Sequence, residues 1–252
     1  MRDVKTGPTI VVGASRGFGR AIALRLAEEG ASVVAIARDA AALSQVADPG
    51  NGSMVAITAV TGDAAHRDLA STIYEAQAPT TVVLVAGAVP PIAPLHEQTW
   101  ESFSVNWETD VHLTFNWLRE ALLRPLVPGS RVIVFSSGAA LAGSPMSGGY
   151  AGAKATQRLM TNYAADESQR AGLGVGFTSV LPVITPLAAV GKPAVVAYAA
   201  QRGISEEEYV AERGPVLTPE AVGDAVLNLA QGDDAELASA YRLSGAGLAP
   251  LS

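Results

Sequence analysis

Short apolar runs rich in β-branched residues alternate along the chain with longer amphipathic segments. Six of these runs are typical of buried strands in a parallel sheet, and they lie at 9–14, 32–38, 54–58, 80–87, 130–138 and 174–182. The segments between them place apolar residues at helical spacing, near 19–31, 64–77, 99–124 and 148–171. This alternation predicts an α/β fold in which a doubly wound, mostly parallel β-sheet is flanked by helices on both faces.

Polar residues and proline indicate where two further helices begin. Asp39 is placed to N-cap a short helix over 40–47, and a Thr-Pro pair opens another helix over 218–230. Residues 240–245 are expected to form a last strand, whereas 187–215 are less regular. No repeat, low-complexity tract or linker interrupts the chain, so we expect a single domain over its whole length.

The composition excludes several classes of function. The chain has 252 residues, 49% of them hydrophobic, which is enough for a sizeable core. No stretch offers about 18 consecutive apolar residues, so we expect no membrane span, and the charged start lacks the apolar region of a signal peptide. With a net charge of −7 and no dense basic run, we expect no nucleic-acid partner. There is no cysteine, and the three histidines form no metal-ligand pattern, so we expect a cytoplasmic protein without a metal site.

Two motifs overlap in VVGASRGFGR, residues 11–20. Gly13, Ser15 and Gly17 fit the G-x-S-x-G elbow that presents the nucleophilic serine of a hydrolase. Such an elbow follows several strands of its sheet and precedes its histidine partner. Ser15 instead follows the first predicted strand, and no histidine occurs after His112. The serine hydrolase therefore remains only a distant alternative.

The same glycines favour a turn that holds a dinucleotide pyrophosphate. Gly13, Gly17 and Gly19 lie between a predicted strand and a predicted helix, which is the context that such a turn requires. The helix N-terminus then offers unpaired N–H groups and the positive end of its dipole to a phosphate. A glycine turn alone is a weak signal, and an ordinary tight strand-to-helix turn is the alternative.

The spacing of these glycines, G-x-x-x-G-x-G, resembles that of the short-chain dehydrogenase/reductase family, and distant positions agree. Residues 150–154 read YAGAK, the Tyr-x-x-x-Lys of the family, and Ser137 precedes the tyrosine by the usual thirteen residues. VAG at 85–87 resembles the Asn-Ala-Gly after the family's fourth strand, and VLP at 180–182 resembles its Pro-Gly segment. The likeness extends over about 9–245 and implies a Rossmann-type fold and an oxidoreductase.

The resemblance implies a catalytic set of Ser137, Tyr150 and Lys154. Tyr150 and Lys154 are four residues apart on a predicted helix and so share a face. A free tyrosine has a pKa near 10, about three units too high for proton transfer near neutral pH, and a neighbouring ammonium favours its ionised form. Tyr150 would give a proton to a carbonyl oxygen or take one from an alcohol, while Ser137 holds that oxygen. Ser136 is the rival to Ser137, and an exposed pair is the alternative for Tyr150 and Lys154.

The cofactor that the resemblance implies is a nicotinamide dinucleotide, and Lys154 would bind its ribose hydroxyls. The other implied contacts lie in the glycine turn and near the ends of the predicted strands. They are Gly13, Ser15, Arg16, Gly17, Phe18, Gly19, Arg38, Asp63, Ala86, Gly87, Tyr150, Pro182 and Ile184. Asp63 resembles the family's adenine-contacting aspartate, and a helix cap is the alternative for it.

The end of the second predicted strand indicates which dinucleotide is bound. NAD-selective sites place a carboxylate about 20 residues past the glycines, on the ribose 2′-hydroxyl. Ala37 stands where that carboxylate is expected, and Arg38 and Arg16 suit the 2′-phosphate of NADP. We therefore expect NADP(H) to be favoured over NAD(H). Asp39 is the alternative carboxylate, displaced by one residue, although a helix cap explains it more simply.

Two short segments depart from the family pattern. Val85 replaces the usual Asn, so the hydrogen bonding there must differ, and Val183 replaces the glycine after Pro182. Thr185 stands closer to Pro182 than the family's threonine, which leaves its role as a cofactor contact open.

The family has a fourth catalytic residue, a helical Asn that organises a water beside the lysine. If Phe103 is aligned with the family's Trp and Phe115 with its Phe, Asp110 takes that position. If Trp100 is aligned instead, Asn106 lies near it, and the two candidates are four residues apart on one helical face.

We prefer Asp110 as this fourth residue. The preference rests on the expectation that Phe103, Trp107 and Val111 lie on the buried side of the helix. A carboxylate there would keep an acceptor for Lys154 but lose a donor.

These residues favour an NADP(H)-dependent enzyme that reduces a carbonyl or oxidises an alcohol, with Tyr150 as general acid and base. The alternative is an NADP-binding sensor of the same fold. The altered Val85, Val183 and Asp110 favour the sensor, whereas the intact catalytic residues oppose it, because a sensor needs no proton chemistry.

Residues 187–215 are expected to cover a small-molecule carbonyl or alcohol substrate. Val195, Val196, Tyr198 and Tyr209 suggest that the substrate is partly apolar, or simply that this covering segment packs on itself. The resemblance also implies a homodimer or homotetramer, formed through the two long predicted helices.

Overall fold

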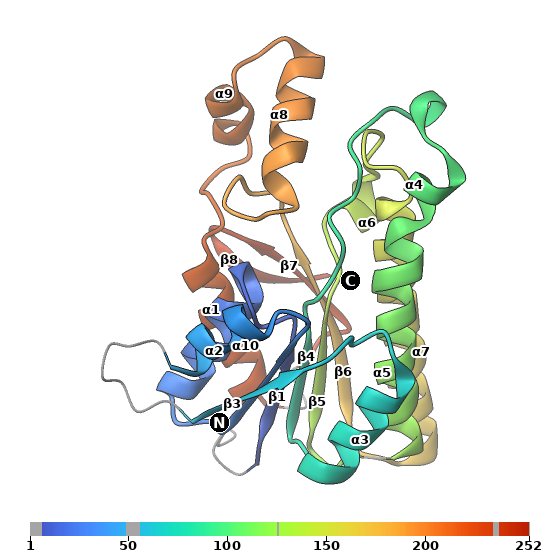
Figure 1. The fold of residues 1–252 in the computed structure, drawn as a ribbon, viewed down its shortest axis with the longest axis vertical. Helices are drawn as coiled ribbons and strands as arrows, with labels where there is room; N and C mark the ends of the chain where they lie inside the picture. Colours follow the sequence, from blue (N-terminus) through green and yellow to red (C-terminus); the bar gives the residue numbers. More distant parts are fainter. Residues whose placement is uncertain (1–6, 49–55, 125, 234–236, 252) are drawn as a thin grey trace.

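The computed structural model describes residues 7–48, 56–124, 126–233 and 237–251. One eight-stranded sheet forms its centre, in the order β3-β2-β1-β4-β5-β6-β7-β8 (Figure 1). All neighbouring strands are parallel except the last pair, β7 and β8, so the predicted doubly wound fold is confirmed. The strands are β1 (Thr9–Val12), β2 (Val33–Ala37), β3 (Ile57–Thr61), β4 (Thr81–Leu84), β5 (Arg131–Phe135), β6 (Gly176–Pro182), β7 (Ala240–Ser244) and β8 (Gly247–Leu251).

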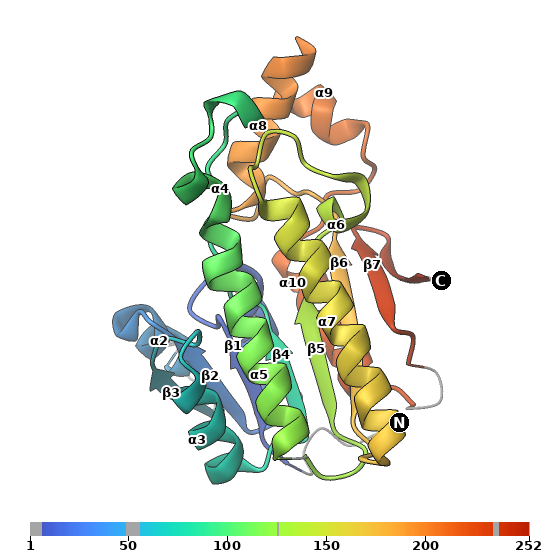
Figure 2. The same ribbon diagram turned by 90° about the vertical axis from the view of Figure 1, so that its right-hand side faces the viewer.

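Alternating side chains of the strands build a separate core on each face of the sheet. On β1, Val11 packs into one core, whereas Ile10 and Val12 pack into the other, as the two-residue period of a strand requires. Figures 1 and 2 show the helices that cover the two faces. The first face carries α1 (Gly17–Glu28), α2 (Ala40–Ala47) and α10 (Pro219–Gln231), and the second carries α3 (Arg67–Gln77), α5 (His112–Leu123) and α7 (Tyr150–Ala171).

The strand order reverses direction at β1, and this reversal sets the place of the site. β1 pairs with β2 on one side and with β4 on the other. In open α/β sheets, ligands bind beyond the carboxyl ends of the strands at such a switch point. The turn after β1 and the segment after β4 therefore meet at one position.

Both predicted helix caps are confirmed. The Asp39 side chain accepts a hydrogen bond from the Ala42 N–H at 3.0 Å at the start of α2. The Thr218 side chain accepts one from the Ala221 N–H at 3.2 Å, and Pro219 opens α10. Each cap satisfies one of the N–H groups that a helix leaves unpaired at its start.

The third strand lies later in the chain than 54–58. Residues 54 and 55 lie outside the described residues, and β3 (Ile57–Thr61) begins where Ile57 pairs with Val33 of β2. β3 is an edge strand, and Thr58, Ala59 and Thr61 are exposed. The predicted bounds, 54–58, are therefore wrong. They followed an apolar run, whereas β3 is defined by its pairing with β2 and not by burial.

Residues 187–215 are more regular than their sequence suggests. They contain α8 (Gly191–Arg202) and α9 (Glu206–Ala211), which pack on each other around Val195, Ala199 and Tyr209. Because this cluster is small, α8 and α9 show little of the long apolar periodicity that marks a core helix. β8 and α6 (Ala139–Ala142) were also missed, because elements of five and four residues carry almost no pattern.

The predicted helix over 99–124 is interrupted by one wider turn. α4 (Trp100–Asn106) and α5 are joined by η3 (Trp107–Val111), a single π-helical turn. Such turns are frequent at functional sites, and this one holds Asp110. Among the described helices, none is both long and apolar enough to cross a bilayer.

Candidate functional site

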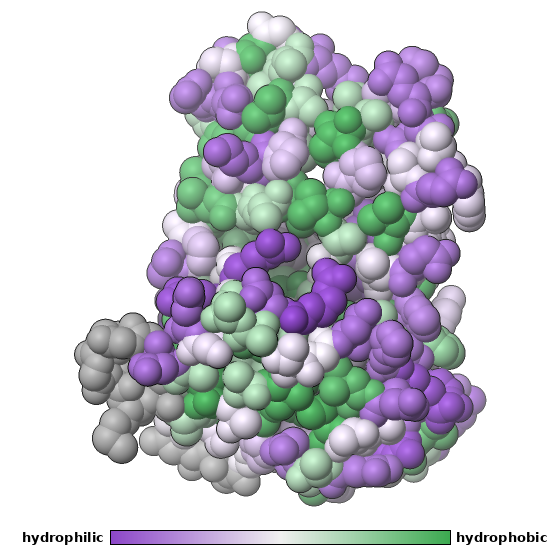
Figure 3. Space-filling view, viewed as in Figure 1, coloured by the Kyte–Doolittle hydropathy of each residue, from purple (hydrophilic) through white to green (hydrophobic). Residues whose placement is uncertain are grey.

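A cleft of about 1340 Å³ opens beyond the carboxyl ends of the strands. Figure 3 shows it as a hollow bordered by hydrophilic side chains. Every residue assigned to the site from the sequence lines this cleft, so the fold brings the whole set together. They are Gly13, Ser15, Arg16, Gly17, Phe18, Gly19, Arg38, Asp63, Ala86, Gly87, Asp110, Ser137, Tyr150, Lys154, Pro182 and Ile184.

The glycine turn leads directly into α1 and leaves its first turn open. Gly17 has a φ of +52°, and a Cβ there would meet nothing within 4 Å. A Cβ on Gly19 would lie 2.1 Å from the Gly13 carbonyl oxygen, so the helix can approach the turn only without one. The N-cap is Arg16, whose side chain makes no capping hydrogen bond. The N–H groups at this helix start can therefore bind an anion, which fits a dinucleotide phosphate.

Two arginines line this cleft beside the glycine turn and the end of β2, with their charges uncompensated. Arg16 and Arg38 are exposed and form no ion pair within the described parts of the chain. Ala37 ends β2, and the Asp39 carboxylate is engaged in capping α2. An anionic group such as a phosphate is the natural partner of this pair of guanidinium groups.

Asp63 follows β3 and lines the same cleft. One of its carboxylate oxygens accepts a hydrogen bond from the Ala65 N–H at 3.1 Å. The N-cap of α3 is His66, so the alternative interpretation of Asp63 as a helix cap is wrong. The carboxylate is about half exposed and remains accessible to a ligand.

Ser15 lies in the glycine turn, away from the partners that a nucleophile needs. Within the described residues, its hydroxyl forms no hydrogen bond with a histidine or a carboxylate. We predict that Ser15→Ala weakens cofactor binding only modestly, because backbone N–H groups carry the phosphate contact. Isothermal titration of both proteins with NADPH measures this, and covalent labelling of Ser15 by a fluorophosphonate probe would restore the hydrolase interpretation.

The candidate catalytic side chains come from the segment after β5 and from α7. Tyr150 is the first residue of α7, and Lys154 follows one turn later on the same face. Ser136 is buried, and its hydroxyl donates a hydrogen bond to the Lys154 carbonyl at 2.7 Å. The Ser137 hydroxyl accepts a bond from the Ala139 N–H at 3.2 Å, which leaves its proton available to a ligand. This difference favours Ser137 over Ser136.

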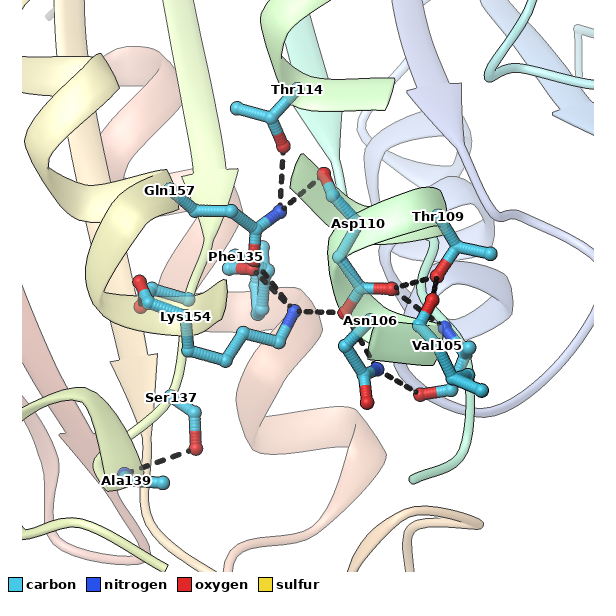
Figure 4. Close-up of polar contacts among 12 residues, drawn as sticks. Val105, Asn106, Thr109, Asp110, Thr114, Phe135, Ser137, Ala139, Lys154 and Gln157 are labelled. Atoms are coloured by element: carbon cyan, nitrogen blue, oxygen red, sulfur yellow. Dashed lines mark hydrogen bonds and ion pairs between the residues drawn. The ribbon is translucent and has the colours of Figure 1, made fainter. Parts of the chain in front are cut away.

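Lys154 is held by three acceptors, as Figure 4 shows. Its Nζ lies 2.8 Å from Gln157 Oε1, 3.0 Å from Asp110 Oδ2 and 3.3 Å from the Phe135 carbonyl oxygen. Burial alone lowers the pKa of this ammonium, but the Asp110 carboxylate and Tyr150 raise it more, so its pKa lies above the ordinary value and it stays charged. Sequence reasoning missed Gln157, although its position three residues after Lys154 on α7 is a usable signal.

Asp110 and Asn106 both belong to this network. The Asn106 amide donates to the Ala88 carbonyl at 2.9 Å and to Asp110 Oδ2 at 3.2 Å. Asp110 reaches Lys154 directly, which is the position expected of it. The reason given for preferring it is wrong, because Trp107 is 39% exposed and the buried side of this helix carries Asn106 and Asp110. Phe103 and Val111 are only half-buried.

The segment 187–215 contacts the opposite side of the cleft through Tyr198. The Tyr198 hydroxyl lies 2.8 Å from Ser144 Oγ and accepts from the Met146 N–H at 3.2 Å. Tyr198 and Tyr209 line the cleft and stack on each other, with ring centroids 6.2 Å apart. Val195 is buried between α8 and α9, so it packs within the segment rather than lining this cleft.

Thr185 anchors the start of this covering segment. It is buried, and its hydroxyl donates to the Leu217 carbonyl at 2.8 Å and accepts from the Leu187 N–H at 3.3 Å. Its polar atoms are thus occupied by the backbone.

Among the described residues, no group of three or more His, Asp or Glu side chains is arranged to hold a metal ion.

Comparisons with known proteins agree with this geometry. A family model described as short chain dehydrogenase matches residues 8–193. A short-chain type dehydrogenase/reductase of Picea abies is 29% identical over 201 residues, which cover 73% of each chain. An uncharacterized NAD-dependent oxidoreductase of Mycobacterium tuberculosis is 29% identical over 212 residues, covering 70% of this chain and 71% of the relative.

Solved structures show the same fold. The crystal structure of a Burkholderia thailandensis oxidoreductase of the short chain dehydrogenase/reductase family has a TM-score of 0.75, with 23% identity. The match covers 95% of this chain and 91% of that one. The match of the family model to most of the chain, together with the fold, places this protein in the short-chain dehydrogenase/reductase family of oxidoreductases.

Proposed function

We propose that this protein is an NADP(H)-dependent oxidoreductase that interconverts a carbonyl and an alcohol, with Tyr150 as general acid and base. The observation that carries the proposal is the position of Ser137, Tyr150 and Lys154. They line one cleft together with the open N-terminus of α1, which suits a dinucleotide phosphate. A reaction that needs both a bound dinucleotide and a positioned proton donor fits this arrangement.

Each catalytic side chain has a defined task in this proposal. A nicotinamide cofactor, when bound, supplies or accepts the hydride. Tyr150 gives a proton to the carbonyl oxygen during reduction and takes one from the alcohol during oxidation. The Ser137 hydroxyl donates a hydrogen bond to the same oxygen and so fixes the substrate. The Lys154 ammonium, whose Nζ lies 5.6 Å from the centre of the Tyr150 ring, favours ionisation of the phenol.

A role of Lys154 in binding the nicotinamide ribose requires a change of partner. An ammonium has three N–H donors, and the three acceptors on Gln157, Asp110 and Phe135 occupy them. The contact with the Phe135 carbonyl is the longest, at 3.3 Å. We infer that this contact is exchanged for a ribose hydroxyl, because it costs the least to break.

The preference for NADP(H) rests on the end of β2. Ala37 offers no carboxylate to a ribose 2′-hydroxyl, and Arg16 and Arg38 are both accessible at the cleft. The relative from Mycobacterium tuberculosis is named NAD-dependent. The residues of this chain itself indicate a different choice, because the two guanidinium groups favour the phosphorylated cofactor, NADP(H).

A panel of aldehydes, ketones and alcohols, assayed with each cofactor by the nicotinamide absorbance band, tests this proposal. We expect turnover with NADPH or NADP⁺ for at least one partly apolar substrate. An NADP-binding sensor would instead bind the cofactor tightly and turn over no member of the panel. That result would favour the sensor, whose supporting observation is the replacement of family residues at Val85 and Val183.

We also propose that the protein self-associates through α5 and α7, which lie side by side (Figure 2). Their outer surface exposes Phe115, Leu159 and Tyr163 at 50% or more, an apolar surface that burial in an interface would stabilise. We expect the native protein to be a dimer or tetramer by light scattering, and Phe115→Glu to shift it toward the monomer. Leu95→Glu, at a leucine outside these helices that is 70% exposed, should leave the mass unchanged.

A native protein that is already a monomer would contradict this assembly. So would an oligomer whose mass Phe115→Glu does not change.

A further inference from the structure

The Asp110 carboxylate is surrounded by hydrogen-bond donors. Its Oδ1 accepts from the Ala88 N–H at 2.8 Å, and its Oδ2 faces Lys154 Nζ at 3.0 Å and the Asn106 amide at 3.2 Å. The Thr109 hydroxyl lies 2.8 Å from Oδ1 and shares its one proton between Asp110 and a backbone carbonyl. The Asp110 side chain is fully buried, so no water competes for these donors.

This arrangement is specific for a carboxylate. The Asn106 amide is oriented by the Ala88 carbonyl, so its NH₂ group must face Asp110. A carboxamide at position 110 has one oxygen and one NH₂ group. In one orientation that NH₂ group would face the Ala88 N–H. In the other it would face the Lys154 ammonium and the Asn106 amide, so it would meet a donor in both. The exchange of the family's Asn for Asp is therefore matched by the surrounding residues.

The space for this carboxylate comes from Gly87. A Cβ on Gly87 would lie 2.8 Å from Asp110 Oδ2. Residue 87, in the segment after β4, therefore has to lack a side chain for Asp110 to reach both Ala88 and Lys154.

Gln157 holds Lys154 against the carboxylate from the other side. Its Nε2 donates to the Asp110 carbonyl at 3.2 Å and to Thr114 Oγ1 at 2.6 Å, which turns its oxygen toward Lys154 (Figure 4). Gln157 is buried, and its carboxamide thus links Lys154 to the backbone of residue 110. Gln157 carries no charge, so it fixes the position of the ammonium without offsetting its charge.

Other titratable groups line the cleft together with Tyr150. Its own helix contributes Lys154, η3 contributes Asp110 with Glu108 at the rim of the cleft, and α8 contributes the Tyr198 phenol and Arg202. Glu212 and Arg213, after α9, line the cleft as well, and Glu212 forms ion pairs with both arginines. Within the described residues, the segments after β4 and β5 offer only backbone and hydroxyl groups there. Of these groups, Lys154 is the charge that contacts the Tyr150 ring, and Asp110 is its ion-pair partner.

We propose that Asp110 is a positioning residue that offsets the charge of Lys154 at Tyr150 and so raises the pH range in which the enzyme oxidises alcohols. The proposal rests on the proposed function for its kinetic meaning. Oxidation needs an ionised Tyr150 to accept the proton, and the ammonium favours that ionised form. A carboxylate 3.0 Å from the ammonium opposes this effect, so more alkaline conditions are needed.

The first test needs no substrate. The absorbance of tyrosinate is followed against pH for the wild-type protein and for Asp110→Asn, and the curve of the matching Tyr150→Phe protein is subtracted from each. We expect the Tyr150 ionisation midpoint of Asp110→Asn to lie lower than that of the wild type by about one pH unit. Circular dichroism defines the pH range in which each protein stays folded.

The matched control is Gln157→Met, which removes one acceptor of Lys154 and leaves the charges unchanged. Its midpoint should move much less than that of Asp110→Asn. Equal shifts in the two variants would assign the effect to the position of Lys154 rather than to its charge, and an unmoved or raised midpoint in Asp110→Asn would overturn the proposal outright.

A second variant covers the loss of folding, because removing one partner of a buried ion pair is strongly destabilising. If Asp110→Asn does not fold, Asp110→Ala with formate supplies the same comparison, because loss of the carboxylate leaves a space for formate beside Lys154, which lines the cleft. We expect a lowered midpoint without formate and a return toward the wild-type value with it. No response to formate, with a midpoint equal to that of the wild type, would contradict the proposal.

The pH profile of kcat for alcohol oxidation should show the same displacement. A wild-type protein that turns over no substrate defeats the proposed function but leaves the absorbance test intact. Turnover with identical pH profiles in both proteins defeats the role of Asp110 alone.

Discussion

Tyr150→Phe is expected to reduce turnover by about 10²-fold or more while leaving cofactor affinity close to that of the wild type. The substitution removes only the hydroxyl that gives or takes the substrate proton. Within the described residues, that hydroxyl forms no hydrogen bond with the protein, so its loss should leave the surroundings unchanged. Steady-state kinetics and NADPH titration of the same preparations measure both quantities.

Tyr163→Phe is the matched control for this variant. Tyr163 lies on the same helix, α7, with 61% of its surface exposed, and does not line the cleft. It should turn over substrate as the wild type does. A Tyr150→Phe protein with the wild-type rate would show that the catalytic assignment is wrong.

Cofactor choice is expected to depend on the end of β2 and on the glycine turn. Arg16 and Arg38 each offer a charge-assisted contact to a 2′-phosphate, worth roughly 1.5–3 kcal/mol before screening. We expect a net preference for NADPH of about 2–3 kcal/mol, or about 30- to 150-fold in affinity. Arg38→Ala should weaken NADPH binding and spare NADH. Ala37→Asp should reverse the preference, since the new carboxylate repels the phosphate and accepts from a free 2′-hydroxyl.

Arg20→Ala serves as the matched control for the arginine variant. Arg20 is exposed on α1, within one turn of Arg16, but it does not line the cleft. Arg20→Ala changes the net charge by the same amount as Arg38→Ala. It should leave the ratio of the NADH and NADPH dissociation constants unchanged. If the unmodified protein binds NADH as tightly as NADPH or more tightly, Asp39 rather than the arginine pair sets the choice.

The parts of the site that could be predicted are those whose geometry follows from one element. Tyr150 and Lys154 share a face because they are one helical turn apart, and the glycine turn is defined by its place between β1 and α1. The doubly wound, mostly parallel sheet likewise follows from the alternation of strands and helices. Each of these predictions needed only local periodicity and chain order.

The surroundings of Lys154 could not be predicted because they depend on how two helical segments pack. Gln157 and Asp110 are 47 residues apart, and they meet only because α7 lies against η3. Asn106 and Asp110 were treated as rivals for one position, whereas the π turn lets both contact Ala88. Side-chain networks of this kind depend on rotation and register between helices, which the hydrophobic pattern does not encode.

The helices within 187–215 were not predicted for a different reason. α8 and α9 bury a small cluster of their own rather than a face on the main core. β8 pairs with β7 alone at the sheet edge, and most of it is exposed. Elements with so little buried surface leave a weak mark on the sequence.

The central claim is that this site transfers hydride to a substrate and that Tyr150 supplies the proton. Deuterium transfer tests it most directly. NADPH deuterated at the reactive carbon is incubated with the carbonyl panel, and the alcohol products are analysed by mass spectrometry. We predict deuterium on the former carbonyl carbon of at least one product with the wild-type protein, and a loss of about 10²-fold or more in its rate with Tyr150→Phe. Tight binding of NADPH without labelled alcohol from any member of the panel would contradict the enzyme and favour a sensor.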